Sequence, residues 1–151
     1  MADRSAVGKE GVAFDVAIER GKIREFARAT RSTHAEYMDE RPVVPPTFLT
    51  TMFFWEEGVE GANPWHHVKL DQKRGMYAEQ EYVFHGPPPR AGTKLVARSR
   101  IESIYDKEGR RGGKLTFAVM VTEFRDVEGK LVAEARMTGV ETEKPPTEDA
   151  K

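Results

Sequence analysis

The chain has 151 residues, with 24 lysines and arginines against 25 aspartates and glutamates and a formal net charge of -1 at pH 7. This length suits a single domain with one core, and the balanced charge provides no basic field to attract nucleic acid or an anionic membrane surface. The chain has no cysteine, which excludes disulfides, thiolate metal sites and a cysteine nucleophile. No apolar run approaches the roughly 18 residues of a membrane span, so we expect a cytoplasmic protein.

The two ends of the chain differ in composition from its middle. Residues 1–12 and 141–151 are mostly small, charged or proline residues, which bury too little apolar surface to become ordered. We therefore expect a flexible N-terminus at residues 1–12, a single domain at residues 13–140 and a disordered tail at residues 141–151.

The first predicted helix covers residues 21–30. Ile23, Phe26, Ala27 and Thr30 recur at helical spacing there, with charged residues on the opposite face. This pattern predicts a short helix with one buried stripe.

A second helix is predicted after a proline-rich stretch. Three prolines between residues 42 and 46 favour an extended loop that leads into a helix start, where Thr47 is the expected cap. Residues 48–57 are apolar around most of a turn, which is typical of a helix buried on nearly every side; a buried strand is the alternative for so short a run. Residues 62–75 show no periodicity and are expected to form a loop.

The C-terminal half changes to the two-residue period of β-strands. Four runs rich in β-branched and aromatic residues cover residues 79–85, 94–105, 114–124 and 130–140. The third run is apolar on both faces, which predicts a central strand. Its neighbours carry charges on one face, so one side of the sheet should meet water or a partner. Short connections favour pairing of consecutive strands, and the pattern predicts an α+β fold with an antiparallel meander wrapped around a helix.

Spacing alone indicates no catalytic or metal-binding motif. His66 and His67 are adjacent, and adjacent side chains diverge in both helices and strands, so we expect no shared metal ion. His85 ends a strand before three prolines, where a packed or rim position is its ordinary role. The sequence contains no phosphate-loop, nucleophile-elbow or zinc-protease pattern.

Four segments form a combined pattern in their order along the chain. They are residues 20–30, TyrMetAspGlu at 37–40, ValProProThrPhe at 44–48, and the stretch 78–95 with GluGlnGluTyr and HisGlyProProProArgAlaGly. In this order and spacing they resemble the MaoC-like hydratase/dehydratase family, and more closely its N-terminal, FAS1-like dehydratase type. The resemblance covers about residues 15–140.

This resemblance implies a hot-dog fold, in which an antiparallel sheet curls around a central helix and two such domains work side by side. Family members add or remove water across the double bond of an acyl thioester carried on coenzyme A or an acyl carrier protein. Coenzyme A is then part of the substrate, and no cofactor is expected. The catalytic signature is Asp-Xaa-Asn-Pro-Xaa-His followed by another Asp. Its Asp and His hold the water and move its proton, while amides at the start of the central helix polarise the thioester carbonyl.

Two residues of this chain depart from that signature. With Asp39 as the trailing Asp, Ser32 stands at the position of the catalytic Asp and Tyr37 at that of the catalytic His. A serine hydroxyl is no general base near neutral pH, and a tyrosine, with an ordinary pKa of about 10, stays protonated. A shifted register does not restore the pair, because His34 and Glu36 are two residues apart rather than five. The resemblance therefore implies that this chain has no catalytic residues.

The resemblance also implies a role for such a chain. Family dehydratases often pair a catalytic hot dog with a degenerate one that supplies a long acyl tunnel. This chain is similar to the degenerate member, which predicts a non-catalytic, substrate-binding subunit of a heteromeric enoyl-CoA hydratase (3-hydroxyacyl-thioester dehydratase) of fatty acid or steroid metabolism. The candidate tunnel residues are Pro46, Thr47, Phe48, Met52 and Trp55, for which core packing is the alternative, and the candidate ligands of the coenzyme A phosphates are Arg90 and Lys94.

Two other functions remain open. Hot-dog thioesterases use varied carboxylates, and the candidates to activate water here are Glu36, Asp39, Glu79 and Glu81. The chain would otherwise be a homodimer that binds acyl-CoA without catalysis. In each case we expect a dimer rather than a monomer, because one hot dog buries its sheet edge against another. With a catalytic MaoC-like subunit the assembly would be a heterodimer or heterotetramer, and we expect no nucleic acid, membrane or metal ion.

Overall fold

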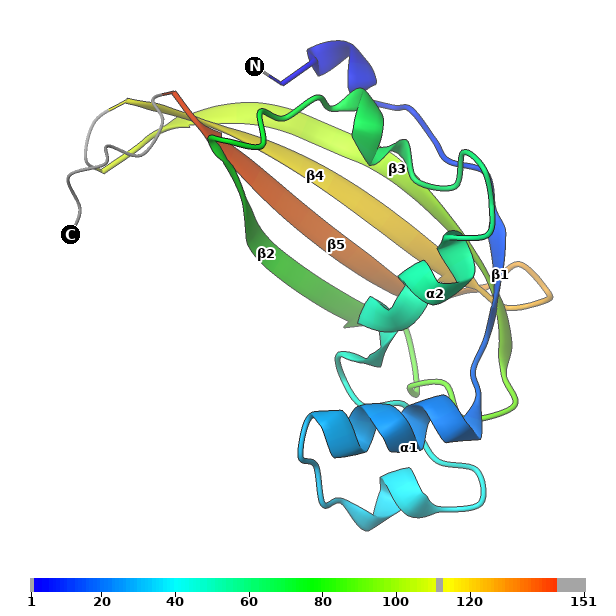
Figure 1. Ribbon diagram of the computed structural model, residues 1–151. Helices are drawn as coiled ribbons and strands as arrows, with labels where there is room; N and C mark the ends of the chain where they lie inside the picture. The colour runs from blue at the N-terminus through cyan, green and yellow to red at the C-terminus, as the bar shows by residue number, and fades with distance from the viewer. Residues whose placement is uncertain (1, 111–112, 144–151) are drawn as a thin grey trace.

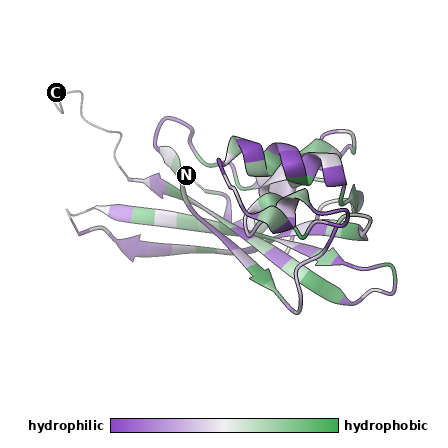
Figure 2. Ribbon diagram, turned by 90° about the horizontal axis from the view of Figure 1, so that it is seen from below, coloured by the Kyte–Doolittle hydropathy of each residue, from purple (hydrophilic) through white to green (hydrophobic). Residues whose placement is uncertain are grey.

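A computed structural model describes residues 2–110 and 113–143, which form one curled antiparallel sheet with helical segments gathered on one side of it (Figure 2). The tail predicted at residues 141–151 lies outside the described residues except for its first three. The elements, with single 3-10 turns labelled η, are η1 Arg4–Ala6, β1 Phe14–Ala17, α1 Arg20–Ala29, η2 Ala35–Met38, η3 Phe48–Met52, α2 Phe53–Glu56, η4 Pro64–His67, β2 Gly75–Phe84, β3 Lys94–Glu108, β4 Lys114–Arg125 and β5 Leu131–Thr142.

The five strands lie in the order β1-β3-β4-β5-β2 (Figure 1). The prediction that the third run is central is therefore confirmed: β4 lies between β3 and β5. Consecutive pairing holds for β3, β4 and β5 but is wrong for β2, which pairs with β5 instead of β3. The reason is that β1 occupies the other edge of β3, with Phe14 opposite Ala97, so the proline-rich connection after β2 crosses the end of the sheet.

The inner, concave face of the sheet carries the core. One cluster forms where η3, α1 and β1 meet the sheet, and its largest fully buried side chains are Phe48 and Phe124. A second cluster around Ile101 and Met120 is covered by the N-terminal segment and by residues near η4. The helix at residues 21–30 is confirmed as α1, with Ile23 and Ala27 fully buried.

The predicted second helix is shorter and more exposed than expected. It consists of one 3-10 stretch, η3, followed by the single turn α2, and Phe53 and Phe54 are 50% and 57% exposed. The expectation of a helix buried on nearly every side is therefore wrong, because only one side of this short segment meets the sheet. Thr47 does stand at the start of η3, but its side chain makes no capping hydrogen bond. The loop predicted at residues 62–75 contains η4, capped by the side chain of Asn63.

Residues 2–12, for which we expected flexibility, lie against β3 and the residues around η4. The backbone N–H groups of Asp3, Gly8 and Gly11 donate to carbonyl oxygens of Val68, Ile101 and Ser99, at 2.8 Å in each case. Ala6 is fully buried in the second cluster. Backbone hydrogen bonds to β3 and to the residue after η4 hold this segment in place, although it has few apolar residues.

Candidate functional site

The segment with the proposed signature positions, residues 32–37, follows α1 and runs into η2, beyond the end of the sheet (Figure 1). The N–H of Ser32 donates to the carbonyl of Ala27 at 2.8 Å, and Arg24 donates to the carbonyl of Met38 at 2.7 Å. The rings of His34 and Tyr37 meet edge to face with centroids 5.8 Å apart. Tyr37 packs its ring against the first core cluster. The segment is well anchored, and its two key positions hold a hydroxyl and a phenol.

The candidate tunnel residues divide between core and surface. Phe48 is fully buried, and its ring meets that of Phe26 at 5.6 Å. Met52 and Trp55 are partly buried against the same cluster, and Lys22 lies 5.4 Å from the Trp55 ring. Pro46 and Thr47 are exposed.

Arg90 and Lys94 lie near the end of the sheet where β3 begins. Arg90 is exposed and donates to the carbonyl of Arg41 at 3.0 Å. Lys94 lines a shallow hollow of about 570 Å³ beside the start of α1, together with Arg20 and Arg41 but also with Glu19 and Glu40. The hollow thus combines both signs of charge.

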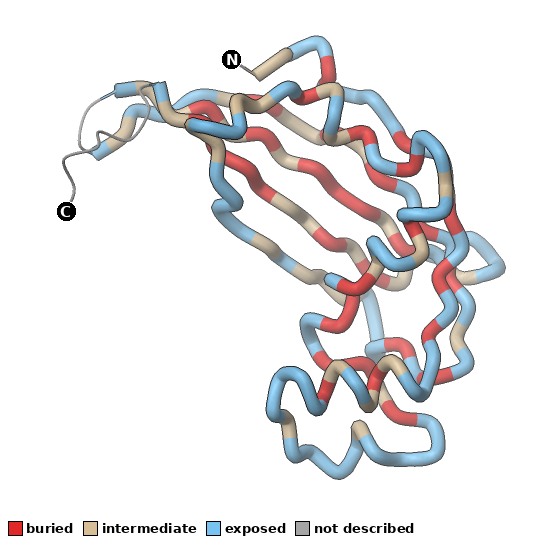
Figure 3. The backbone as a smooth tube through the Cα atoms, viewed as in Figure 1, coloured by how far each residue is buried: buried red, intermediate tan, exposed pale blue. Residues whose placement is uncertain are grey.

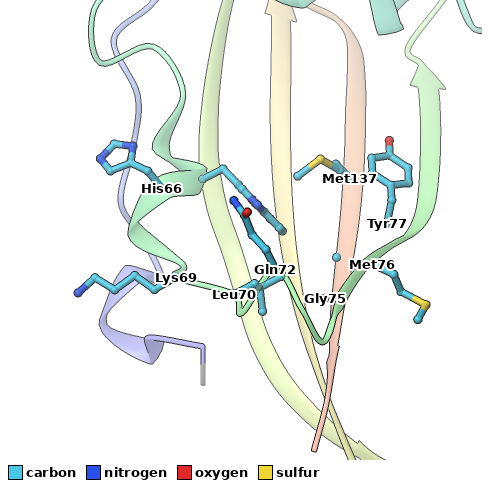
Figure 4. Close-up of a pocket in the computed structure, with 10 residues that line it drawn as sticks. His66, Lys69, Leu70, Gln72, Gly75, Met76, Tyr77 and Met137 are labelled. Carbon is cyan, nitrogen blue, oxygen red and sulfur yellow. The ribbon is translucent and has the colours of Figure 1, made fainter. Parts of the chain in front are cut away.

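A pocket of about 420 Å³ opens on the inner face at the opposite end of the sheet (Figure 4). Its apolar wall comes from Trp65 and Leu70, and Met137 of β5 also lines it. Met76 and Tyr77, at the start of β2, are more than half exposed at its mouth. Lys69 lies at the rim, where it forms an ion pair with Asp3 at 3.0 Å. The pocket is therefore largely apolar inside and polar at its rim, a combination that suits an amphipathic ligand.

A second hollow of about 500 Å³ shares His66 with this pocket and is lined by α2 and the loop that follows it. Glu56 lies there with only 7% of its surface exposed. Burial raises the pKa of its carboxyl above the ordinary value, and a hydrogen bond with Asn63 partly offsets the shift. Its Oε1 atom has no hydrogen-bond partner among the described residues. Glu56 is thus a buried carboxyl group that lines this hollow.

Two tyrosines of β2 face the inner side: Tyr77 lines the first pocket and Tyr82 packs against the first core cluster. Tyr82 lies opposite Ala135 and Tyr77 opposite Gly139, both inner-face residues of β5. Burial raises the pKa of both phenols; a hydrogen bond with Thr50 opposes the shift at Tyr82. Tyr77 also donates to the side-chain oxygen of Gln80. Both side chains therefore act here as neutral hydroxyl groups.

Sequence comparison agrees with this architecture. The profile of the FAS1-like dehydratase domain region matches residues 5–135. A curated protein of Streptomyces griseus, called UPF0336 protein, is 31% identical over 119 residues, which are 71% of this chain and 76% of that protein. A UPF0336 protein of Streptomyces avermitilis is 32% identical over 117 residues, with the same coverage of 71% and 76%.

The chain belongs to the FAS1-like dehydratase family. Solved structures place this FAS1-like dehydratase domain among the MaoC-like hot-dog proteins, which confirms the predicted α+β hot-dog fold. A truncated HadBC complex, a (3R)-hydroxyacyl-ACP dehydratase of Mycobacterium tuberculosis, aligns with a TM-score of 0.68 and 26% identity over 89% of this chain and 96% of that one. The ChsH1-ChsH2 complex of the same organism aligns with a TM-score of 0.71 and 13% identity over 97% and 89%, a likeness of fold alone.

Several residues of this FAS1-like dehydratase domain escape sequence reasoning. Trp65, Leu70 and Met137 help to line the pocket and Glu56 is a buried carboxyl group, yet no motif marks them. The only feature of the sequence that could have indicated the pocket is a tryptophan, Trp65, in a stretch without periodicity. Among residues 2–110 and 113–143, no three His, Asp or Glu side chains are placed to hold a metal ion; in the same part of the chain, no helix is long and apolar enough to cross a membrane.

Proposed function

We propose that this chain is the non-catalytic, substrate-binding subunit of a heteromeric enoyl-thioester hydratase (3-hydroxyacyl-thioester dehydratase). The observation that carries the proposal is the pair of residues at the signature positions, Ser32 and Tyr37. Neither is a general base that takes a proton from water near neutral pH. The Asp and His of the reaction would come from a MaoC-like partner subunit.

The position of the inner-face pocket supports this role. Two similar hot dogs that pair about a two-fold axis bring their edge strands together antiparallel. The end of the partner's edge strand then lies beside Gly75, where β2 of this chain begins. In the present fold, the end of β2 leads to the end of the sheet beside the signature segment (Figure 1). The partner's catalytic end would therefore lie beside the pocket at Met76 and Tyr77, and an acyl chain from that site would enter it.

The size and lining of the pocket fit an acyl group. Its 420 Å³ falls within the range of about 300–1,000 Å³ that is usual for small-molecule sites. Arg90 and Lys94 lie where β3 begins, at the end of the sheet opposite to the pocket. The 15 residues of β3 extend about 50 Å. The candidate coenzyme A phosphate site at Arg90 and Lys94 is therefore separate from the acyl pocket.

The decisive experiment combines this chain with a MaoC-like subunit that carries the Asp and His. Purified alone, the chain should not hydrate crotonyl-CoA or longer enoyl-CoA thioesters; mixed with the partner, it should extend turnover to long chains. Met137→Trp should fill the pocket and reduce turnover of long substrates while crotonyl-CoA is spared. Val127→Trp, which lies 79% exposed in the β4–β5 turn, is the matched control.

Three results would contradict the proposal or favour an alternative. Robust hydration by the isolated chain would exclude a non-catalytic subunit. Release of free thiol from acyl-CoA, abolished by substitution of Glu36, Asp39, Glu79 or Glu81, would favour the thioesterase. Tight acyl-CoA binding by the chain alone as a homodimer would favour the binding module.

A further inference from the structure

We propose that the free edge of β2 selects its partner by charge. Glu79 and Glu81 oppose the pairing of two copies of this chain, and they fit an edge strand that presents lysine or arginine opposite them. This inference rests on the proposed function, because it assumes that the edge of β2 is where a partner hot dog docks.

The β2 edge is long and open. Among the described residues, β2 pairs only with β5 and ends the sheet. Figure 3 shows it as exposed or half-buried along its length, in contrast to the buried central strands. An edge of this length presents a row of backbone groups that can pair with another strand.

Glu79 and Glu81 both point to the outer face of the sheet. Glu81 lies opposite Arg136 and Glu79 opposite Thr138, and residues directly opposite each other share a face. Both glutamates are exposed. Their carboxylates therefore lie on the outer face of the sheet, next to the position that the side chains of a docked strand would occupy.

Arg136 does not neutralise this acidic edge. Its guanidinium lies 4.0 Å from Glu81, but 2.7 Å from Glu102 and 3.4 Å from Glu134. One arginine is thus shared by three carboxylates. Arg100 reaches Glu102 at 3.2 Å, and no ion pair to Glu79 occurs within the described part of the chain. The edge keeps an excess of negative charge.

Self-pairing would oppose these charges directly. In an antiparallel pair of two β2 strands with their faces matched, three registers join most of the strand. They place Glu79 opposite its own copy, Glu79 opposite Glu81, or Glu81 opposite its own copy. Like charges directly opposite each other are destabilising, and opposite charges are favourable. Every such register penalises the homodimer, whereas lysine or arginine at the same positions of a different chain converts the penalty into an attraction.

A charge-swap experiment tests whether charge controls pairing at the β2 edge, and it needs only the wild-type chain and a variant of it. Glu79→Lys/Glu81→Lys is prepared in the full chain, and the wild type, the variant and their mixture are compared by analytical ultracentrifugation at low salt. We expect the wild type and the variant to self-associate weakly and the mixture to form a dimer of one copy of each. The Kd of the mixed dimer should be at least about tenfold lower than that of either homodimer.

Two controls make the outcome decisive. Glu57→Lys/Glu60→Lys changes the net charge equally at exposed positions outside the strand, and it should not dimerise with the wild type. Glu79→Gln/Glu81→Gln should strengthen self-association, because it removes repulsion. A mixture no tighter than the wild type alone, or a wild-type homodimer as tight as the glutamine variant, would overturn the inference. Hydration is not measured, so a failure here is distinguishable from a failure of the hydratase proposal.

Discussion

Gly139 of β5 allows the indole ring of Trp65 to lie directly on the inner face of the sheet. A Cβ atom at position 139 would lie 2.7 Å from Cζ2 of Trp65 and 3.0 Å from Cδ1 of Leu70. Both separations are shorter than normal carbon–carbon contacts. Because Trp65 and Leu70 line the inner-face pocket, this glycine sets how closely that wall approaches the sheet.

Gly139→Ala should therefore destabilise the protein by about 1–3 kcal/mol, because overpacking forces the indole off the sheet. Urea unfolding measures the stability, and the change in Trp fluorescence reports the displacement of the ring. Gly21→Ala is the control: nothing lies within 4 Å of its Cβ, and alanine should stabilise the α1 helix by up to about 1 kcal/mol. Equal stability of Gly139→Ala and the wild type would contradict the packing argument.

Phe48 and Phe54 should respond very differently to truncation. Phe48 is fully buried, so Phe48→Ala should cost about 3–5 kcal/mol in unfolding free energy. Phe54 is 57% exposed, and its contact with Lys22 at 5.2 Å is a surface one, so Phe54→Ala should cost less than about 1 kcal/mol. Comparable losses in thermal or urea unfolding would mean that the short helix lies differently on the sheet.

Glu56 should make the protein less stable as pH rises. Burial raises its folded-state pKa above 4.5, so the folded state binds the proton more tightly than the unfolded state. The free energy of unfolding then declines as pH rises from about the pKa of the unfolded state to the raised pKa of the folded state. Above the raised pKa it no longer changes with this group. Glu56→Gln should abolish this decline and be more stable than the wild type at neutral pH. Chemical unfolding at a series of pH values measures the stability of each variant. Glu57→Gln, at an exposed position, should keep the pH dependence of the wild type.

Asp3 should contribute stability with the opposite pH dependence. Hydrogen bonds from Ser5, and then from Lys69, lower its pKa from 3.8 to about 2. A lowered pKa stabilises the folded state at pH values above the pKa of the unfolded state. This stabilisation is lost as pH falls through the pKa of the folded state. Asp3→Asn should therefore lower Tm at neutral pH, and the difference should shrink as pH falls toward 2. Glu10→Gln, which removes only the exposed pair with Arg98 at 3.2 Å, should change Tm little.

Restoring the signature residues tests the register of Ser32 and Tyr37. Ser32→Asp/Tyr37→His should give the isolated chain measurable hydration of crotonyl-CoA, because it returns a base and a proton carrier to an anchored segment. Loss of absorbance of the enoyl thioester measures the reaction. Ser32→Asn/Tyr37→Phe is the matched control and should remain inactive. Equal activity of the two variants would show that another group performs the chemistry.

Local sequence patterns predicted the regular elements well. The four strand runs correspond to β2, β3, β4 and β5, because alternation and β-branched side chains act over neighbouring residues. The run 114–124 is apolar on both faces, which predicted a central strand, and β4 is central. The four-residue β1 was not predicted: so short a strand has no resolvable period, and its pairing with β3 stabilises it.

The proposal that Ser32 and Tyr37 replace the catalytic pair comes from the sequence alone, because it depends only on which residue stands at each position. The candidate pocket could not be predicted in this way. Trp65 and Gly139 are distant in the chain and meet only because β5 runs beneath η4. In the same way, Glu79 and Glu81 lie on an open strand edge only because β2 takes the outside of the sheet. The sequence by itself determined the family and the strands, and it is the basis of the proposal that the catalytic pair is missing. Long-range strand pairing, which no local pattern encodes, decided the pocket and the edge.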